Sequence, residues 1–242
     1  MTTNVYLEIK AKDAIKAVER NDLIIAIDVL RCSSSILSAF ANGAKEVIPA
    51  KTFKQARSLR NIHPDYLLAG ERGGLKPRGF DFGNSPLEFT REKVYEKTLI
   101  MTTTSGTDTL TRLKAIKWVL IGAFVNVEFV AATALEIAEK EKRDVSLILS
   151  GRKGLFSLED FICGGVIAEK LQERKANLTD ASFSAFLAFR HAKGNLLLNI
   201  IKGEHAKHLI KLGFREDIEY ACQLNIINIV PIYKDGIIRL PK

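Results

Sequence analysis

Short apolar runs alternate along this chain with longer segments in which apolar residues recur at helical spacing. The runs are rich in Ile, Leu and Val and are bounded by polar residues, which is typical of buried strands. Strands are predicted at Val5–Ile9, Leu23–Ile27, Glu46–Ile48, Tyr66–Ala69, Thr98–Thr102, Trp118–Ile121, Val145–Leu149, Ile229–Tyr233 and Ile237–Leu240. Helices are predicted between most of them, at Ser33–Asn42, Thr52–Arg60, Gly106–Lys114, Val127–Lys140, Leu158–Glu173, Ser182–Phe189, His205–Leu212 and Arg215–Gln223.

The alternation of strands and helices predicts an α/β fold with three layers, α/β/α, and a largely parallel sheet. Lys234-Asp235-Gly236 separates the last two strands and is typical of a hairpin turn. The sheet is therefore predicted to be mixed, with an antiparallel C-terminal hairpin at one edge. No stretch is dominated by Pro, Ser or Gly, so we expect residues 1–242 to form a single unit, as one domain or two closely packed lobes.

The junctions that follow the strands are the candidate sites, because ligands of open α/β sheets bind beyond the carboxyl ends of the strands. At the first junction, Asp28 and Arg31 precede a row of hydroxyls that includes Ser33 and Ser34. A guanidinium binds phosphate oxygens in a bidentate manner, and a carboxylate can hold Mg²⁺ or accept a proton. A helix cap with a solvent-exposed Asp and Arg explains the same residues about equally well.

The second junction is the long loop from Gly70 to Pro86, which begins with Glu71 and Arg72 and continues through Asp81 and Asn84. Loops of this length are usually functional or disordered, and its apolar anchors argue for order. Glu71 is a candidate metal ligand, and Arg72 is a candidate anion ligand. Asp81 and Asn84 are equally well explained as turn-forming side chains.

The third junction gathers hydroxyls and a glycine before a helix, at Thr103, Thr104, Ser105 and Gly106. Backbone amides and hydroxyls in this arrangement form a cradle for a phosphate or carboxylate. The loop lacks the lysine and glycine spacing of a Walker motif, and a simple N-cap explains it nearly as well.

The fourth junction combines Arg152 and Lys153 with the acidic pair Glu159 and Asp160. A capping box from Ser157 to Asp160 is one interpretation of this pattern. The other is that Glu159 or Asp160 turns inward to hold a metal, and the sequence leaves open which of the two does so. Acids and arginines gathered at one site indicate Mg²⁺ and a substrate rich in negative charge.

The net charge of +8 allows nucleic acid, an acidic membrane or a small anion as the partner. Basic residues are mixed with acidic ones, and no run interleaves basic and aromatic residues as a groove for single strands does. No apolar run approaches the roughly 20 residues of a membrane span. The three cysteines are widely separated and suggest a reducing compartment. We therefore expect a cytoplasmic protein that binds a small anionic phosphorylated substrate, with no nucleic acid or membrane partner, and that can form a homo-oligomer such as a dimer.

Several of these motifs together resemble the 2-phosphosulfolactate phosphatase family. The resemblance covers nearly the whole chain and is carried by Asp28–Arg31, Gly70–Gly74, Gly79–Pro86, Thr102–Thr107, Gly151–Gly154, Ser157–Gly165 and Leu212–Tyr220. It implies a Mg²⁺-dependent phosphatase that hydrolyses 2-phospho-3-sulfolactate to sulfolactate and phosphate, a step towards coenzyme M. Ser105 and Asp108 depart from the family pattern, which more often has an amide and a cation at these positions.

The resemblance and the junctions together suggest Mg²⁺ held by Asp28, Asp160 and Glu71, with Arg31, Arg72 and Arg152 neutralising the substrate. Ser33, Ser34, Asn84, Thr103, Thr104, Ser105 and Gly106 are the expected substrate-binding residues. A metal-activated water is the preferred nucleophile, and Asp28 is the rival. Arg31→Ala is expected to impair turnover far more than folding. His63, His191, His205 and His208 fall outside the four junctions, so histidine chemistry is not expected. A non-catalytic anion- or nucleotide-binding module is the alternative function.

Overall fold

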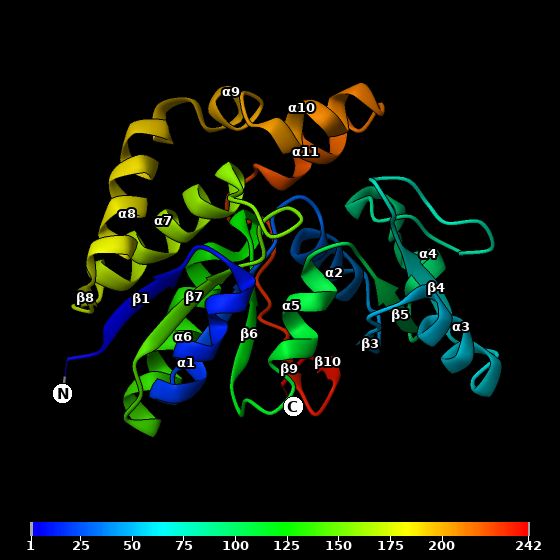
Figure 1. Ribbon diagram of the computed structural model, residues 1–242, viewed down its shortest axis with the longest axis horizontal. Coiled ribbons are helices and arrows are strands. Elements are labelled where there is room, and N and C mark those ends of the chain that lie inside the picture. The colour runs from blue at the N-terminus through cyan, green and yellow to red at the C-terminus, as the bar shows by residue number, and fades with distance from the viewer. Residues whose placement is uncertain (1, 242) are drawn as a thin grey trace.

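A mixed sheet of ten strands runs through the part of the protein that the computed structural model describes, residues 2–241 (Figure 1). The strands are β1 (Asn4–Glu8), β2 (Leu23–Ile27), β3 (Glu46–Pro49), β4 (Leu67–Gly70), β5 (Thr98–Thr102), β6 (Val119–Gly122), β7 (Val145–Leu149), β8 (Asn177–Leu178), β9 (Ile232–Lys234) and β10 (Ile237–Arg239). Their order across the sheet is β4-β5-β3-β10-β9-β6-β2-β7-β1-β8.

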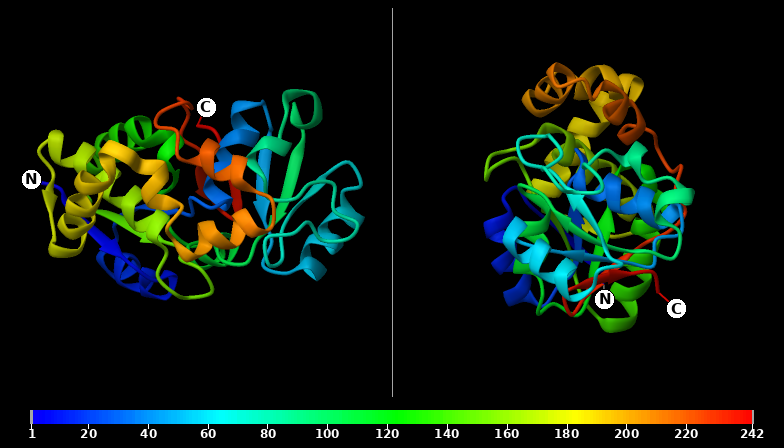
Figure 2. Two further views of the ribbon diagram at one scale, coloured as in Figure 1. Left: turned by 90° about the horizontal axis from the view of Figure 1, so that it is seen from above. Right: turned by 90° about the vertical axis from the view of Figure 1, so that its right-hand side faces the viewer.

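Helices cover both faces of this sheet (Figure 2). They are α1 (Ala14–Arg20), α2 (Cys32–Ala41), α3 (Phe53–Ile62), α4 (Arg91–Val94), α5 (Gly106–Arg112), α6 (Val127–Glu141), α7 (Leu158–Glu173), α8 (Asp180–Ala192), α9 (Leu196–Ile200), α10 (Glu204–Lys211) and α11 (Arg215–Ala221), with short 3-10 turns η1 (Ala11–Asp13), η2 (Pro86–Glu88), η3 (Phe124–Asn126) and η4 (Lys193–Asn195).

The strand β2 shows why both faces are covered, because all five of its residues are buried. Leu23, Ile25 and Ile27 belong to one apolar core with α6 and α7, whereas Ile24 and Ala26 belong to a second core with α1 and α2. Side chains alternate between the two faces of a strand, so a continuous apolar run requires a helix layer on each side. The predicted three-layer α/β/α architecture is confirmed.

Two parallel half-sheets meet at the C-terminal hairpin. Strands β4, β5 and β3 are parallel to one another, and so are β6, β2, β7, β1 and β8. Strand β10 pairs antiparallel with β3 through Ile238 and Val47, and β9 pairs antiparallel with β6. The sequence prediction of an antiparallel C-terminal hairpin in a mixed sheet is confirmed. Its predicted place at an edge is wrong, because both of its outer sides are hydrogen-bonded to neighbouring strands.

This topology makes the two half-sheets run in opposite directions, since β3, β10, β9 and β6 are antiparallel at each step. Five steps separate β5 from β2 in the strand order. At about 20–25° of twist per step, the two strands are rotated by roughly 100–125° relative to each other. The twist therefore allows loops that follow strands of both halves to approach one another.

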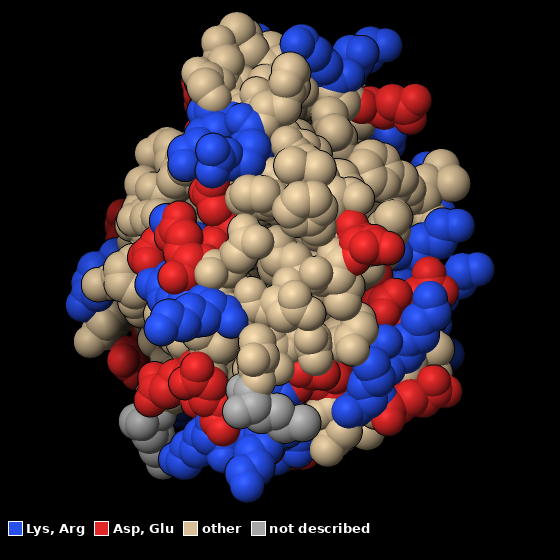
Figure 3. Space-filling model, turned by 90° about the vertical axis from the view of Figure 1, so that its left-hand side faces the viewer, with Lys and Arg blue, Asp and Glu red and all other residues tan. Residues whose placement is uncertain are grey.

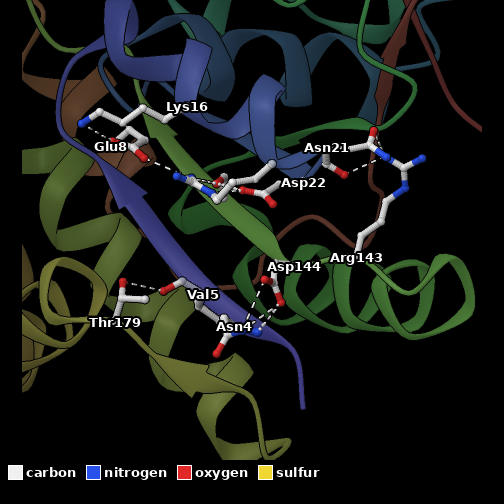
Figure 4. A network of polar contacts seen from close by, with 11 residues as sticks. Asn4, Val5, Glu8, Lys16, Asn21, Asp22, Arg143, Asp144 and Thr179 are labelled. Atoms are coloured by element: carbon white, nitrogen blue, oxygen red, sulfur yellow. Dashed lines mark hydrogen bonds and ion pairs between the residues drawn. The ribbon is translucent and has the colours of Figure 1, made fainter. Parts of the chain in front are cut away.

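A network of polar contacts joins β1 and α1 to the residues that directly precede β2 and β7 (Figure 4). Arg20 Nε donates to Asp22 Oδ2 at 2.8 Å, and its Nη2 donates to Glu8 Oε1 at 3.1 Å. The Asn4 backbone N–H donates to Asp144 Oδ1 at 2.8 Å. The contact between Asn4 and Asp144 thus connects segments that are 140 residues apart in the sequence.

The surface drawn in Figure 3 mixes basic and acidic side chains around an uncharged central area. The net charge of +8 is not gathered into one continuous basic area on this face. Within residues 2–241, no helix combines the length and apolar character needed to cross a bilayer.

Candidate active site

A cavity of about 120 Å³ lies where the loops after β2, β4, β5 and β7 meet helix α10. In Figure 1 the C-terminal helices α9 to α11 pass over the loops that follow these strands. The residues that line the cavity are Asp28, Leu30, Arg31, Glu71, Gly73, Gly74, Asn84, Thr103, Thr104, Ser105, Gly151, Arg152, Lys153, His205, His208 and Leu209. The structure therefore brings together all four junctions singled out in the sequence.

Asp28 lies at the cavity directly after β2 and is only 8% exposed. Its Oδ1 accepts the Cys32 backbone N–H at 3.1 Å, and its Oδ2 faces Gly106 so closely that a Cβ there would lie 2.6 Å away. Burial raises the pKa of Asp28 to about 6, with a further contribution from the charges of Glu71 and Glu159, while His205 acts to lower it. Asp28 is thus able to exchange a proton near neutral pH.

Glu71 connects the loops after β4 and β5. Its Oε2 accepts the Gly74 N–H at 2.8 Å, and its Oε1 accepts the Thr104 N–H at 2.6 Å. The Thr104 hydroxyl oxygen is buried and has no hydrogen-bond partner among the described residues. Gly106 packs against Cys32 and Asp28 with no space for a side chain. Of the predicted cradle, Thr103, Thr104 and Ser105 therefore line the cavity, whereas Gly106 lies behind them against Asp28 and Cys32.

Arg31 is buried at the cavity, but both of its terminal nitrogens are bonded to the protein. Nη1 forms an ion pair with Asp217 Oδ2 at 2.7 Å, and Nη2 donates to the Gly74 carbonyl oxygen at 2.6 Å. The guanidinium also lies over the Phe214 ring, 4.3 Å from its centroid. Arg31 thus connects three segments, a role that the sequence analysis did not foresee.

The two other predicted arginines differ in position. Arg152 lines the cavity beside Lys153, and no ion pair of its side chain occurs among residues 2–241. Arg72 is exposed, lies 4.8 Å from the Phe53 ring centroid, and is not part of the cavity wall. The backbone groups of Arg72 and Leu75 pair with each other and close a turn at this position. The prediction that Arg72 faces the substrate is corrected in this respect.

Of the predicted ligands Ser33, Ser34 and Asn84, the two serines lie outside the cavity wall and Asn84 lies in it. The Ser33 hydroxyl accepts the Asp28 N–H at 3.0 Å, and the Ser34 hydroxyl donates to the Val29 carbonyl at 2.8 Å. Both serines are buried outside the cavity wall, because they close the first turn of α2. Asn84 does line the cavity, and its Oδ1 is buried with no partner among the described residues. An unpaired buried amide is free to bind a ligand.

The contacts of Glu159 and Asp160, at the start of α7, show that neither side chain lines the cavity. Asp160 accepts the Val29 N–H at 2.8 Å and the Gly151 N–H at 3.1 Å, so it ties the loop after β2 to the loop after β7 and does not line the cavity. Glu159 is 1% exposed, and its Oε1 lies 2.8 Å from His205 Nδ1. Burial is the largest influence and acts to raise the pKa of Glu159, but the contact with His205 and the hydrogen bonds from Ser157 and the Glu159 backbone together lower it.

Two histidines at the cavity were missed by the sequence analysis. His205 and His208 lie on α10 and line the wall opposite the strand loops. The expectation that all four histidines lie away from the site is wrong for these two, because the chain after α8 returns across the sheet. The motif from Leu212 to Tyr220 was the available signal that this segment belongs to the site.

Two of the three predicted Mg²⁺ ligands, Asp28 and Glu71, line the cavity, and Asp160 does not. Mg²⁺ prefers oxygen ligands and keeps several waters, so one or two carboxylates are sufficient. Asp28 and Glu71 line the same cavity and repel each other, and a divalent cation would relieve that repulsion. Within residues 2–241, no three His, Cys, Asp or Glu side chains are arranged to hold a metal ion. The predicted trio of Asp28, Glu71 and Asp160 is therefore not assembled.

Comparison with known proteins gives consistent results. Residues 9–236 match a family model described as 2-phosphosulpholactate phosphatase. The chain is 40% identical over 234 residues to a probable 2-phosphosulfolactate phosphatase of Clostridium beijerinckii, covering 94% of this chain and 95% of the relative. Proteins with the same description from Clostridium acetobutylicum (38% over 236 residues, covering 96% and 98%) and Thermotoga petrophila (37% over 214 residues, covering 88% and 89%) are similar over most of their lengths.

Proposed function

Because this chain belongs to the 2-phosphosulfolactate phosphatase family and is a phosphoric monoester hydrolase, we propose that it hydrolyses 2-phospho-3-sulfolactate, or a related phosphorylated 2-hydroxy acid, in the manner of coenzyme M biosynthesis. The observation that carries this proposal is that Asp28 and His205 line the same cavity as Arg152, Lys153 and the hydroxyl loop from Thr103 to Ser105. Proton-exchanging and anion-binding groups are thus gathered in a space suited to a small ligand.

Anion binding is assigned to the side of the cavity formed by the loops after β5 and β7. Arg152 and Lys153 supply positive charge, and Thr103, Thr104 and Ser105 supply hydroxyls. The Ser105 hydroxyl accepts the Lys153 backbone N–H at 3.2 Å, which holds the two loops together. Charge and hydrogen bonds fixed in advance stabilise the charge that develops on phosphate oxygens during transfer.

We propose Mg²⁺ as the cofactor, held by Asp28 and Glu71. When bound, Mg²⁺ neutralises phosphate charge and lowers the pKa of water. Asp28 and Glu71 are oriented for this role by backbone N–H groups, from Cys32 to Asp28 and from Gly74 and Thr104 to Glu71. The remaining lone pairs of these carboxylates are available to a cation.

Water is the nucleophile in this proposal, and covalent attack by Asp28 is the rival. Burial raises the pKa of the Cys32 thiol well above its ordinary value, so this neighbouring cysteine is not an activated nucleophile. Borohydride trapping during turnover separates the two routes, because it reduces an aspartyl phosphate and leaves a free carboxylate unchanged. We expect no reduced side chain at Asp28 if water attacks phosphorus directly. A reduced Asp28 side chain, detected by mass spectrometry of the digested protein, would support the rival route.

The decisive experiment measures phosphate release from 2-phosphosulfolactate and a panel of phosphorylated 2-hydroxy acids, with Mg²⁺ and with EDTA. We expect turnover that depends on Mg²⁺, and a loss of turnover in Asp28→Asn. His191→Gln is the matched control, since His191 is exposed on α8 and far from the cavity wall. Ligand binding without turnover of any ester would instead indicate a non-catalytic anion-binding module.

A further inference from the structure

His205 and Glu159 form a carboxylate–imidazole pair that the proposed function does not yet use. His205 is part of the cavity wall, whereas Glu159 lies behind it and is not. The contact between Glu159 Oε1 and His205 Nδ1 is 2.8 Å long, and the Glu159 side chain is 1% exposed against 20% for His205. The pair therefore joins a buried anion to a ring that reaches the ligand space.

The buried carboxylate determines which ring nitrogen is available. A carboxylate accepts hydrogen bonds, so Nδ1 of His205 carries its proton towards Glu159. The other ring nitrogen, Nε2, is then the atom left for a ligand in the cavity. Glu159 lies in the first turn of α7, where the helix dipole stabilises its negative charge.

The second cavity histidine is engaged differently. His208 Nε2 lies 3.2 Å from the Gly73 carbonyl oxygen. The carbonyl oxygen can only accept a hydrogen bond, so this nitrogen carries a proton and donates to it. Arg152 and Lys153 also line the cavity, where they are assigned to binding the anion. Mg²⁺ prefers oxygen ligands over imidazole, so metal binding does not explain His205.

We propose that His205 is the general acid for the leaving group and that Glu159 is its positioning residue, an inference that rests on the proposed phosphatase activity. The bond between phosphorus and the ester oxygen breaks, its electron pair goes to that oxygen, and His205 Nε2–H gives it a proton. Water supplies the hydroxyl that phosphorus gains and releases a proton, which restores the imidazolium. A secondary alkoxide is a poor leaving group, so it needs this proton.

Comparing two esters tests the role of His205. The kcat/KM values are measured for a 2-phosphorylated hydroxy acid and for p-nitrophenyl phosphate, whose leaving group needs no proton. We expect His205→Gln to lower kcat/KM by about 10²- to 10⁴-fold on the first ester and by less than about tenfold on the second. Glu159→Gln should show a smaller loss of the same selective kind, whereas Asp28→Asn should affect both esters. His191→Gln is the control with unchanged activity.

Three results would overturn the inference or its premise. An equal loss on both esters, or no loss on either, removes the general-acid role while leaving the phosphatase proposal intact. No turnover of any ester by the wild-type protein removes the proposed function and this inference with it. The third result comes from ¹⁵N NMR of the wild-type protein, which does not depend on activity or on the folding of a variant. Neutral His205 is expected to carry its proton on Nδ1, and a proton on Nε2 would contradict the Glu159 pairing.

Discussion

Asp28 carries a charge that its surroundings disfavour. It is buried at the end of β2, and burial raises the pKa of its carboxyl group from 3.8 to about 6. Between these two values the folded protein holds a proton that the unfolded chain has lost. The free energy of unfolding therefore falls as the pH rises through this window. At neutral pH the protein is therefore less stable for having an ionised Asp28 carboxylate at the cavity.

Asp28→Asn is expected to raise the free energy of unfolding at pH 7.5 by up to about 3 kcal/mol, since one pKa unit corresponds to about 1.4 kcal/mol. The gain over the wild type should shrink as the pH is lowered towards 4, because the wild-type carboxyl group is then neutral in both states. Urea unfolding in EDTA at several pH values measures the difference. An Asp28→Asn protein that is less stable than the wild type at pH 7.5 would contradict this account of Asp28.

Arg31 was predicted from the sequence to bind the substrate, and the structure places it in a buried ion pair. Its ion pair with Asp217 is almost completely buried, and Asp217 also accepts the Ser85 hydroxyl at 2.6 Å. Removing one partner of a buried ion pair leaves the other charge uncompensated. The earlier expectation that Arg31→Ala spares folding is therefore revised.

At the element scale, Arg31→Ala is expected to lower the free energy of unfolding by about 3–5 kcal/mol, because the loop after β2 loses its connection to α11. Arg72→Ala is the matched control. This arginine is exposed and lies over the Phe53 ring, so we expect a loss of about 1 kcal/mol or less. Chemical unfolding of both variants measures the difference, and similar losses would show that the buried pair is not what distinguishes them.

Helix and strand positions followed from the sequence where the apolar pattern was continuous. Strand β2, strand β7 and helix α7 begin and end at the residues predicted for them. The first helix, α1, and the short α9 were not predicted, because each has too few turns to show a period clearly. The contact between α7 and α10 through Glu159 and His205 joins residues 46 positions apart, and no local pattern encodes it.

At the scale of the whole molecule, the C-terminal hairpin joins the two half-sheets. Ile238 is fully buried and pairs with Val47 on one half, while β9 pairs with β6 on the other. The last strands of the chain thus complete a sheet whose other members come from earlier segments. Folding of the two halves is expected to be coupled through this pair of strands.

Ile238→Ala is expected to lower the free energy of unfolding by about 2–5 kcal/mol, since it leaves a cavity where the half-sheets meet. Ile237→Ala, on the neighbouring and partly exposed position of the same strand, is the control and should cost clearly less. Urea unfolding measures both variants. Equal effects at the two positions would indicate that the hairpin is not part of the core that joins the halves.

The sequence by itself determined the α/β class, the mixed sheet and the four junctions that line the cavity, because apolar period and loop chemistry are local properties. Tertiary structure decided the rest. It placed the hairpin inside the sheet, bonded Arg31 to Asp217, turned Arg72 away, and brought His205 to Glu159. Each of these depends on which distant segments pack together, and packing is a property of the whole chain.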